Sequence, residues 1–330
     1  MKITFRFLIL IFLCSSFYSN AQTCCSGGVP VSGNLGMPLS DSKTLQFNLS
    51  YDYNNLNTLK SNRTVIDDNS RKRTTHSILF ETGYSFNQRF SADVFFSYVR
   101  QERLINNNNN EDFTYTQGIG DVVVLLKYLL MKGDQDKANL VVGGGVKLPV
   151  GISDKLNSQN GLPLNADLQP GSGAFDFIGW GQWSKATRFR PSMSYFSTLI
   201  YSYKGINNSY LGQNNYQFGQ EFSWSVGIGD QLFLASQIIE PSIQVRYRNA
   251  QADLFNNDEL PSTGGDWLFI TPGISFWVNP DFSIETNVEL PLFARVEGTQ
   301  VTPTLRWNIG FFYKFQLSKN KNNFTPTIIK

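Results

Sequence analysis

The stretch that decides the fold is residues 216–228, YQFGQEFSWSVGI. Apolar and polar side chains alternate through it with a period of two, and only Gln220 interrupts the apolar series. One parity holds Tyr216, Phe218, Phe222, Trp224, Val226 and Ile228, and the other holds Gln217, Gly219, Glu221, Ser223, Ser225 and Gly227. Because a β-strand points successive side chains to opposite faces, the pattern predicts one apolar, aromatic face and one small, polar face. A transmembrane β-barrel needs apolar side chains toward lipid and polar ones toward its lumen.

The same alternation recurs along most of the chain in segments of roughly ten residues. The predicted strands are 44–53, 75–86, 90–103, 118–131, 138–150, 174–185, 190–203, 215–228, 232–248, 267–278, 282–292 and 303–315. The sequence therefore predicts an all-β fold, a transmembrane antiparallel up-and-down β-barrel of about 12 strands that spans residues 44–315.

The connections between the predicted strands fall into two classes of length. Tight turns are expected at 87–89, 132–137, 186–189, 229–231 and 279–281. Longer loops are expected at 54–74, 104–114, 151–173, 204–214, 249–266 and 293–302. Short and long connections alternate, so all the short ones lie at one end, as in bacterial outer-membrane barrels with periplasmic turns and external loops. A soluble β-sandwich also alternates along its strands, but its loops need not sort by length.

The two ends of the chain fit export to that membrane. Lys2 and Arg6, the apolar run 7–13 and the small residues before Ala21 have the form of a cleaved signal peptide, residues 1–21. Residues 22–43 would then form a periplasmic or lumenal N-terminal segment, and 316–330 a polar C-terminal tail. The last strand ends in Phe315, which is similar to the aromatic C-terminal signal read by the barrel-assembly machinery, an expected partner together with outer-membrane lipid.

Composition narrows the classes of function. The formal charge of +2 falls to zero once Lys2 and Arg6 are removed, which leaves no basic excess for a nucleic-acid partner. The mean hydropathy of −0.23, with no long apolar run after the N-terminus, argues against transmembrane helices. Aromatic residues make up 14% of the chain, which suits a barrel with aromatic girdles at the two membrane interfaces.

Three short motifs resemble a known family. They are Gly118-Ile119-Gly120-Asp121-Val122 followed by Leu126-Lys127-Tyr128, Lys147-Leu148-Pro149-Val150-Gly151, and Leu168-Gln169-Pro170-Gly171-Ser172-Gly173 running into Phe175-Asp176-Phe177. This region resembles the outer-membrane proteins of the meta-pathway of phenol degradation family. The resemblance implies a barrel that passes small hydrophobic or aromatic molecules, and it singles out Gly118, Gly120, Asp121, Gln169, Pro170, Gly171, Gly173 and Asp176. It implies no catalytic residue.

An enzymatic barrel is disfavoured by the positions of the residues that it would need. Outer-membrane phospholipases pair a His with a Ser two residues later, but the only His, His76, is followed at that position by Ile78. Ser77 points to the opposite face of the strand. The sequence therefore predicts no enzyme, no cofactor and no metal site, with His76 as an interfacial imidazole.

The side chains that are predicted to face the lumen include both acids and bases. They therefore do not resemble the ring of like charges that forms an ion filter. One interpretation is a network of cross-strand pairs and water, and the other is a dedicated ligand site or constriction. The constriction candidates are Glu221, Glu240, Arg246, Arg248, Glu285, Glu289 and Arg306. Among them, Glu221 and Arg246 are expected to be neighbours because their strands are adjacent.

Three further features are open to two interpretations each. Gly143-Gly144-Gly145 interrupts a strand, either as a kink that helps the sheet to close or where a plug or ligand approaches the backbone. Cys24 and Cys25 are adjacent, and an exported chain favours a disulfide, within or between chains, over a metal. The segment that follows them, 26–38, could enter the barrel as a plug or simply lead into the first strand.

Two functions are compatible with the sequence. The first is an outer-membrane channel for small, hydrophobic or aromatic molecules, with the loops 151–173 and 249–266 gating uptake. The second is a structural or adhesive surface barrel with a blocked lumen and external loops that bind a partner.

Overall fold

The computed structural model describes residues 35–317, apart from 69, 108–109, 134–137, 158–160 and 235–236. The predicted signal peptide 1–21 and the pair Cys24 and Cys25 lie outside the described residues, as does the C-terminal tail beyond Leu317.

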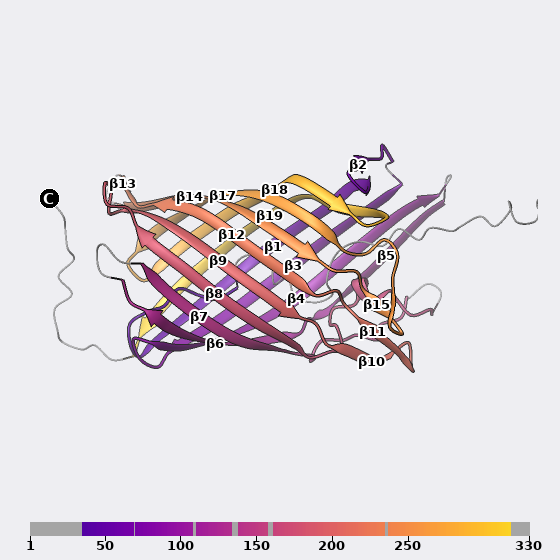
Figure 1. Ribbon diagram of the computed structural model, residues 1–330, viewed down its shortest axis with the longest axis horizontal. Helices are drawn as coiled ribbons and strands as arrows, with labels where there is room; N and C mark the ends of the chain where they lie inside the picture. Colours follow the sequence, from indigo (N-terminus) through magenta and orange to yellow (C-terminus); the bar gives the residue numbers. More distant parts are fainter. Residues whose placement is uncertain are drawn as a thin grey trace, which may run out of the picture.

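Twelve antiparallel strands close into a barrel, as the sequence predicted (Figure 1). They are β1 (Thr44–Ser61), β3 (Arg71–Ser85), β4 (Phe90–Asn107), β6 (Val122–Met131), β7 (Asn139–Leu148), β8 (Asp176–Ala186), β9 (Met193–Tyr203), β12 (Glu221–Asp230), β14 (Gln237–Ala250), β17 (Gly265–Asn279), β18 (Phe282–Val296) and β19 (Thr299–Gln316). β1 pairs with β3 on one side and with β19 on the other, which closes the wall. Thr44 lies opposite Gln316, so the first strand begins and the last strand ends at the same rim.

The alternation of side chains places an apolar belt on the outside of the barrel. In β12, Trp224 and Val226 are exposed, whereas Ser223 and Ser225 are buried inside. In β19, Trp307, Phe311, Tyr313 and Phe315 are likewise exposed. Large exposed apolar side chains along the strands are what a lipid-facing wall requires. The chain is thus a β-barrel of the outer-membrane type.

The end of the barrel that carries the long connections, which we call the external end, is more structured than the sequence suggested. The predicted loops 54–74, 104–114 and 293–302 consist mainly of strand, because β1, β4, β18 and β19 continue beyond the belt as hairpins. β5 (Asn110–Ile119) pairs with the outer part of β4, and β2 (Thr64–Val65) folds back on β1. Asn-rich sequence discourages strands inside a sheet, but an exposed hairpin can pair its backbone whatever its side chains are. At the opposite rim, the first residues of the predicted strand 232–248 form a separate short strand, β13 (Leu232–Leu234), which pairs with β14.

The prediction for the first residues of 216–228 is wrong. β12 begins only at Glu221, and Tyr216 belongs to a separate four-stranded sheet made of β10 (Ile206–Tyr210), β11 (Asn214–Gln217), β15 (Leu254–Phe255) and β16 (Asp258–Glu259). Tyr216 and Phe218 are buried there with Ala166 and Tyr210 instead of facing lipid. The irregularity at Gln220 therefore marks the end of one sheet and the start of another. We call this small sheet, together with the loop 149–175, the external cap; it lies at the right-hand end in Figure 1.

Helical structure is confined to a single 3-10 turn, η1 (Ala166–Leu168), among the residues that the structure describes. None of the described residues forms a helix long and apolar enough to cross a membrane.

Candidate functional site

The segment before β1 lies inside the barrel and is held there by hydrogen bonds to the wall. The indole Nε1 of Trp180 donates to the carbonyl oxygen of Leu35 at 2.7 Å. The amide nitrogen of Met37 donates to Asp93 at 3.1 Å, and the ammonium of Lys127 donates to the carbonyl oxygen of Met37. Leu35 and Met37 are buried, and Gly36 donates its amide to the carboxylate of Glu81 at 3.2 Å. We call residues 35–38 the lumenal segment.

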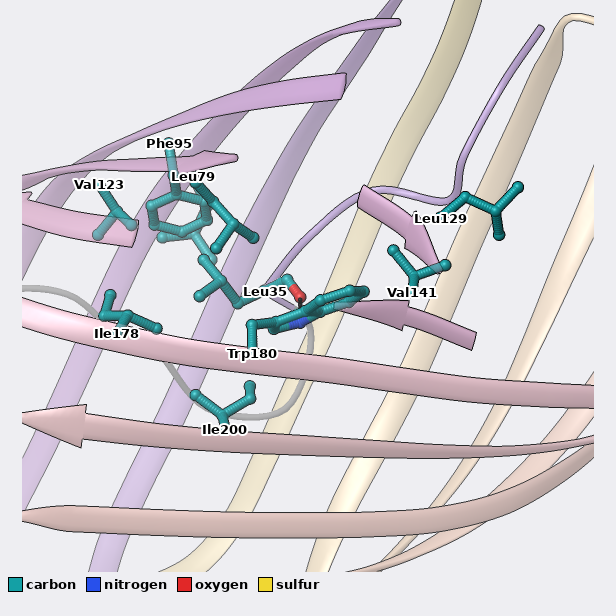
Figure 2. Close-up of a cluster of buried hydrophobic side chains, with 10 residues drawn as sticks. Leu35, Leu79, Phe95, Val123, Leu129, Val141, Ile178, Trp180 and Ile200 are labelled. Carbon is teal, nitrogen blue, oxygen red and sulfur yellow. Dashed lines mark hydrogen bonds between the residues drawn. The ribbon is translucent and has the colours of Figure 1, made fainter. Parts of the chain in front are cut away.

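One side of the lumen carries a buried apolar cluster, which the alternation along the strands did not predict. Leu35 packs in a buried cluster contributed by β3, β4, β6, β7, β8 and β9 (Figure 2). The cluster contains Leu35, Leu79, Phe95, Val123, Leu125, Leu129, Val141, Ile178, Trp180 and Ile200. A signal was present, because 122–131 reads VVVLLKYLLM, and a strand buried on both faces gives a continuous apolar run.

The three consecutive glycines border this apolar side. A Cβ at Gly143 would lie 2.9 Å from the carbonyl oxygen of Leu126 and 3.3 Å from the ring of Trp180. A Cβ at Gly145 would lie 2.7 Å from the carbonyl oxygen of Val124. Pairing between β6 and β7 continues through these glycines without a bulge. The observed geometry favours close packing, next to the side chain that holds the lumenal segment, over the kink.

The opposite side of the lumen carries paired charges. Arg246 makes two hydrogen bonds to Glu289, at 2.8 and 2.7 Å, and its guanidinium lies over the ring of Phe269. Such two-point pairing of a guanidinium with a carboxylate is strong and specific in geometry. Glu289 is buried together with Arg246, so each charge depends on the other.

Two more pairs complete this side. Arg248 bonds to Glu221 at 2.8 Å and lies over the ring of Trp267, and Arg306 bonds to Asp52 at 2.7 Å. Glu221 thus bonds to Arg248, whereas Arg246, the neighbour expected for it, acts on it through its charge alone. The reason is register, because Arg246 lies opposite Ser225, four residues further along β12.

The remaining candidates, Glu240 and Glu285, do not join these pairs. Glu240 accepts a hydrogen bond from the indole Nε1 of Trp277 at 3.2 Å, and Glu285 accepts one from the side-chain amide of Asn48 at 3.2 Å. Both lie opposite Ser275 of β17, one from each neighbouring strand. They therefore stand at one level of the barrel, two strands apart.

Three successive cavities follow the lumenal segment through the barrel. The first, of about 680 Å³, lies at the rim of the short turns and is lined by residues such as Pro38, Lys132 and Lys314. It shares Pro38 and Gln182 with a second cavity of about 340 Å³. A third, of about 50 Å³, shares Leu35, Asn48, Glu81, Gln244, Thr271, Glu285 and Asn287 with the second. The third cavity also reaches Arg306 and Glu289, at the level of the paired charges.

The motif residues meet at the external end, although 118–121 and 168–176 are far apart in sequence. The carboxylate of Asp121 accepts hydrogen bonds from the amide and the hydroxyl of Ser172, at 2.9 and 2.7 Å, and from the amide of Gly151 at 3.1 Å. Lys147 lies 3.2 Å from Asp121 and 2.7 Å from Asp176. All these charged groups are buried. The motif residues thus fasten the loop 149–175 to the barrel wall.

The motif glycines and Gln169 lie at the same contact between the loop 149–175 and the barrel wall. A Cβ at Gly171 would lie 2.5 Å from the backbone of Gly151, and one at Gly118 would lie 3.3 Å from Pro170. Gly173 has a positive φ of 69°, which favours glycine. Gln169 exchanges hydrogen bonds with the backbone of Lys155, at 2.9 and 3.0 Å. Gly120 precedes Asp121 at the break between β5 and β6, where its amide donates to the carbonyl oxygen of Ser97 at 2.9 Å.

Asp253, which directly precedes β15 of the cap, is a buried acid with a raised pKa. Asp253 accepts hydrogen bonds from the hydroxyl of Tyr216 at 2.6 Å and from the amide of Gly219 at 2.8 Å. Burial raises the pKa of Asp253 to about 6, although these hydrogen bonds oppose the shift. Burial also raises the pKa of Tyr216, so its hydroxyl stays protonated and donates.

His76 faces outward on β3, hydrogen-bonded to the hydroxyl of Tyr51 at 2.7 Å and beside the ring of Tyr53. Ser77 is buried on the opposite face of the strand. Within the described residues, no group of three or more His, Cys, Asp or Glu is arranged to hold a metal ion.

Comparison with known proteins shows a likeness of fold. No family model and no curated protein matches the sequence. The COG4313 outer membrane channel from Pseudomonas putida F1 superposes with a TM-score of 0.61 at 11% identity, covering 86% of this chain and all of that one. The CymD monoaromatic hydrocarbon channel gives a TM-score of 0.40 at 9% identity, covering 84% of this chain and 90% of that one. At these identities the likeness concerns the barrel fold alone.

Proposed function

We propose that the protein is a channel that carries small hydrophobic or aromatic molecules across the outer membrane. The observation that carries the proposal is the succession of cavities beside the lumenal segment, which reaches from one rim to the middle of the barrel. A purely structural barrel has no need of such space along its axis. The resemblance of residues 118–180 to a family of outer-membrane barrels for hydrophobic solutes supports the same reading.

The hydrophobic character of the solute follows from the apolar side of the lumen. Leu79, Phe95 and Ile178 would offer a transient apolar surface if Leu35 moved away from them. Water-filled porins line their lumen with polar side chains, whereas ligand pockets for apolar molecules are lined mainly by hydrophobic ones. Displacement of the lumenal segment would thus exchange one apolar occupant, Leu35, for another.

The test is uptake across a membrane that apolar molecules cross slowly by themselves. Vesicles with lipopolysaccharide in the outer leaflet and serum albumin inside would receive 1-methylnaphthalene, with and without the folded protein. We expect the protein to accelerate uptake several-fold, with little swelling in disaccharides. No acceleration together with no measurable conductance would refute the channel and favour the surface barrel with a blocked lumen.

A further inference from the structure

In the part of the chain that the structure describes, the second lumenal cavity, of about 340 Å³, is lined by acidic side chains without basic ones. Its lining includes the carboxylates of Glu81, Glu240 and Glu285 and, among the described residues, no lysine or arginine. The other lumenal acids next to it are matched, since Glu289 bonds to Arg246 and Asp52 to Arg306. The acidic side chains that lack a basic partner are therefore concentrated in this cavity.

The partners of the three carboxylates are mostly neutral. Glu285 accepts from Asn48 and Glu240 from Trp277, both uncharged donors. Glu81 accepts from the amide of Gly36 and feels the charge of Lys127, which is itself paired with Asp93 at 2.5 Å. Carboxylates in a low-dielectric interior are costly without a positive partner, and inside a membrane they usually mark a functional site.

A second feature of the cavity is an unsatisfied hydroxyl. Thr271 is only 5% exposed, it lines the cavity, and its hydroxyl finds no hydrogen-bond partner in the described part of the chain. Buried polar groups of this kind normally have partners. A hydroxyl can accept from an N–H donor, so it offers a ligand amine one more contact beside the carboxylates.

The wall of the cavity also offers an aromatic surface. Trp277 and Phe312 line it and pack edge to face, with ring centroids 6.2 Å apart. Aromatic faces attract cations, and tryptophan does so most strongly. A compact organic molecule with a positive group and an apolar body would satisfy the carboxylates, the hydroxyl and the rings together.

From this geometry we propose that the cavity binds a protonated amine carried on a small aromatic body. The proposal rests on the proposed channel function and names a class of solute within it. The amine would lie between Glu240 and Glu285, which flank Ser275 from the two neighbouring strands. Its aromatic body would lie toward Trp277 and Phe312.

The test compares 2-phenylethylammonium with its neutral counterpart 2-phenylethanol. Binding to the folded full-length protein in detergent would be measured by isothermal titration calorimetry at pH 7.5, with protein-free micelles as the blank. We expect the ammonium to bind at least tenfold more tightly than the alcohol. In Glu240→Gln/Glu285→Gln the two affinities should fall within about twofold of each other. Glu259→Gln, the same change at an exposed cap residue, should keep the preference.

Equal affinities in the unmodified protein, or an undiminished preference in the double variant, would overturn the proposal. Heat-modifiability on a gel checks that each variant is folded, and the two single variants replace the double one if it does not fold. Uptake of neutral 1-methylnaphthalene by the same variants separates the two claims. If that uptake is present without a preference for the amine, only the amine site fails; if it is absent from the unmodified protein, the channel itself fails.

Discussion

The hold of Trp180 on the lumenal segment can be tested by Trp180→Phe. The substitution keeps most of the ring but removes the 2.7 Å hydrogen bond to Leu35 and leaves that buried carbonyl oxygen without its indole donor. A buried acceptor that loses its partner costs about 1–3 kcal/mol. If the segment exchanges between a docked and an undocked state, its undocked population should rise by roughly 5–150-fold. Single-channel recording should then show longer or more frequent high-conductance openings.

The chain offers a matched control on the same strand. Trp183 of β8 faces outward, so Trp183→Phe makes the same change of side chain without touching the lumen. We expect Trp183→Phe to record like the unmodified protein. Identical traces from Trp180→Phe and the unmodified protein, with both folded, would refute the idea that this hydrogen bond controls the position of the lumenal segment.

Four further outcomes follow from the structure. Val226→Lys places a charge on the lipid-facing wall and should cost about 2–4 kcal/mol, lowering the folded yield on a heat-modifiability gel, whereas Ser242→Lys, in the wall of the acidic cavity, should fold normally. Glu289→Gln leaves Arg246 buried without its partner and should lower the free energy of unfolding by about 3–5 kcal/mol in urea titration, while Arg246→Met/Glu289→Met should recover most of that loss. The pKa of Asp253 is raised to about 6, so its contribution to cap stability is full below about pH 4 and is lost as the pH rises through 6; proteolysis of the cap should be faster at pH 7.5 than at pH 5, and Asp253→Asn should remove that difference. A tag inserted at 106–110 should be labelled on intact cells and one after Lys330 only after permeabilisation, whereas the reverse pattern would invert the topology.

The contact between Trp180 and Leu35 could be predicted only in part from the sequence. The period-two pattern places the side chain of Trp180 on the inward face of 174–185, but it does not reveal that the lumen contains Leu35 to receive it. The apolar side of the lumen was missed for a related reason. Alternation shows which side chains face inward, but it does not show whether they contact water or pack against other side chains. Only the run in 122–131 indicated apolar side chains on both faces of a strand.

What the sequence by itself determined is the barrel: the facing of Trp224 and Val226, the number of strands, and the ends at which short and long connections lie. These features follow from the periodicity of the strands and from the turn residues, and both depend only on residues that are close together in the sequence. Only the tertiary structure decided that Glu221 bonds to Arg248, that Tyr216 and Phe218 belong to the cap, and that Asp121 meets Ser172. Each depends on register or on contacts between distant segments. A shift of pairing by two residues would change every partner across the strands while leaving the same side chains facing the lumen.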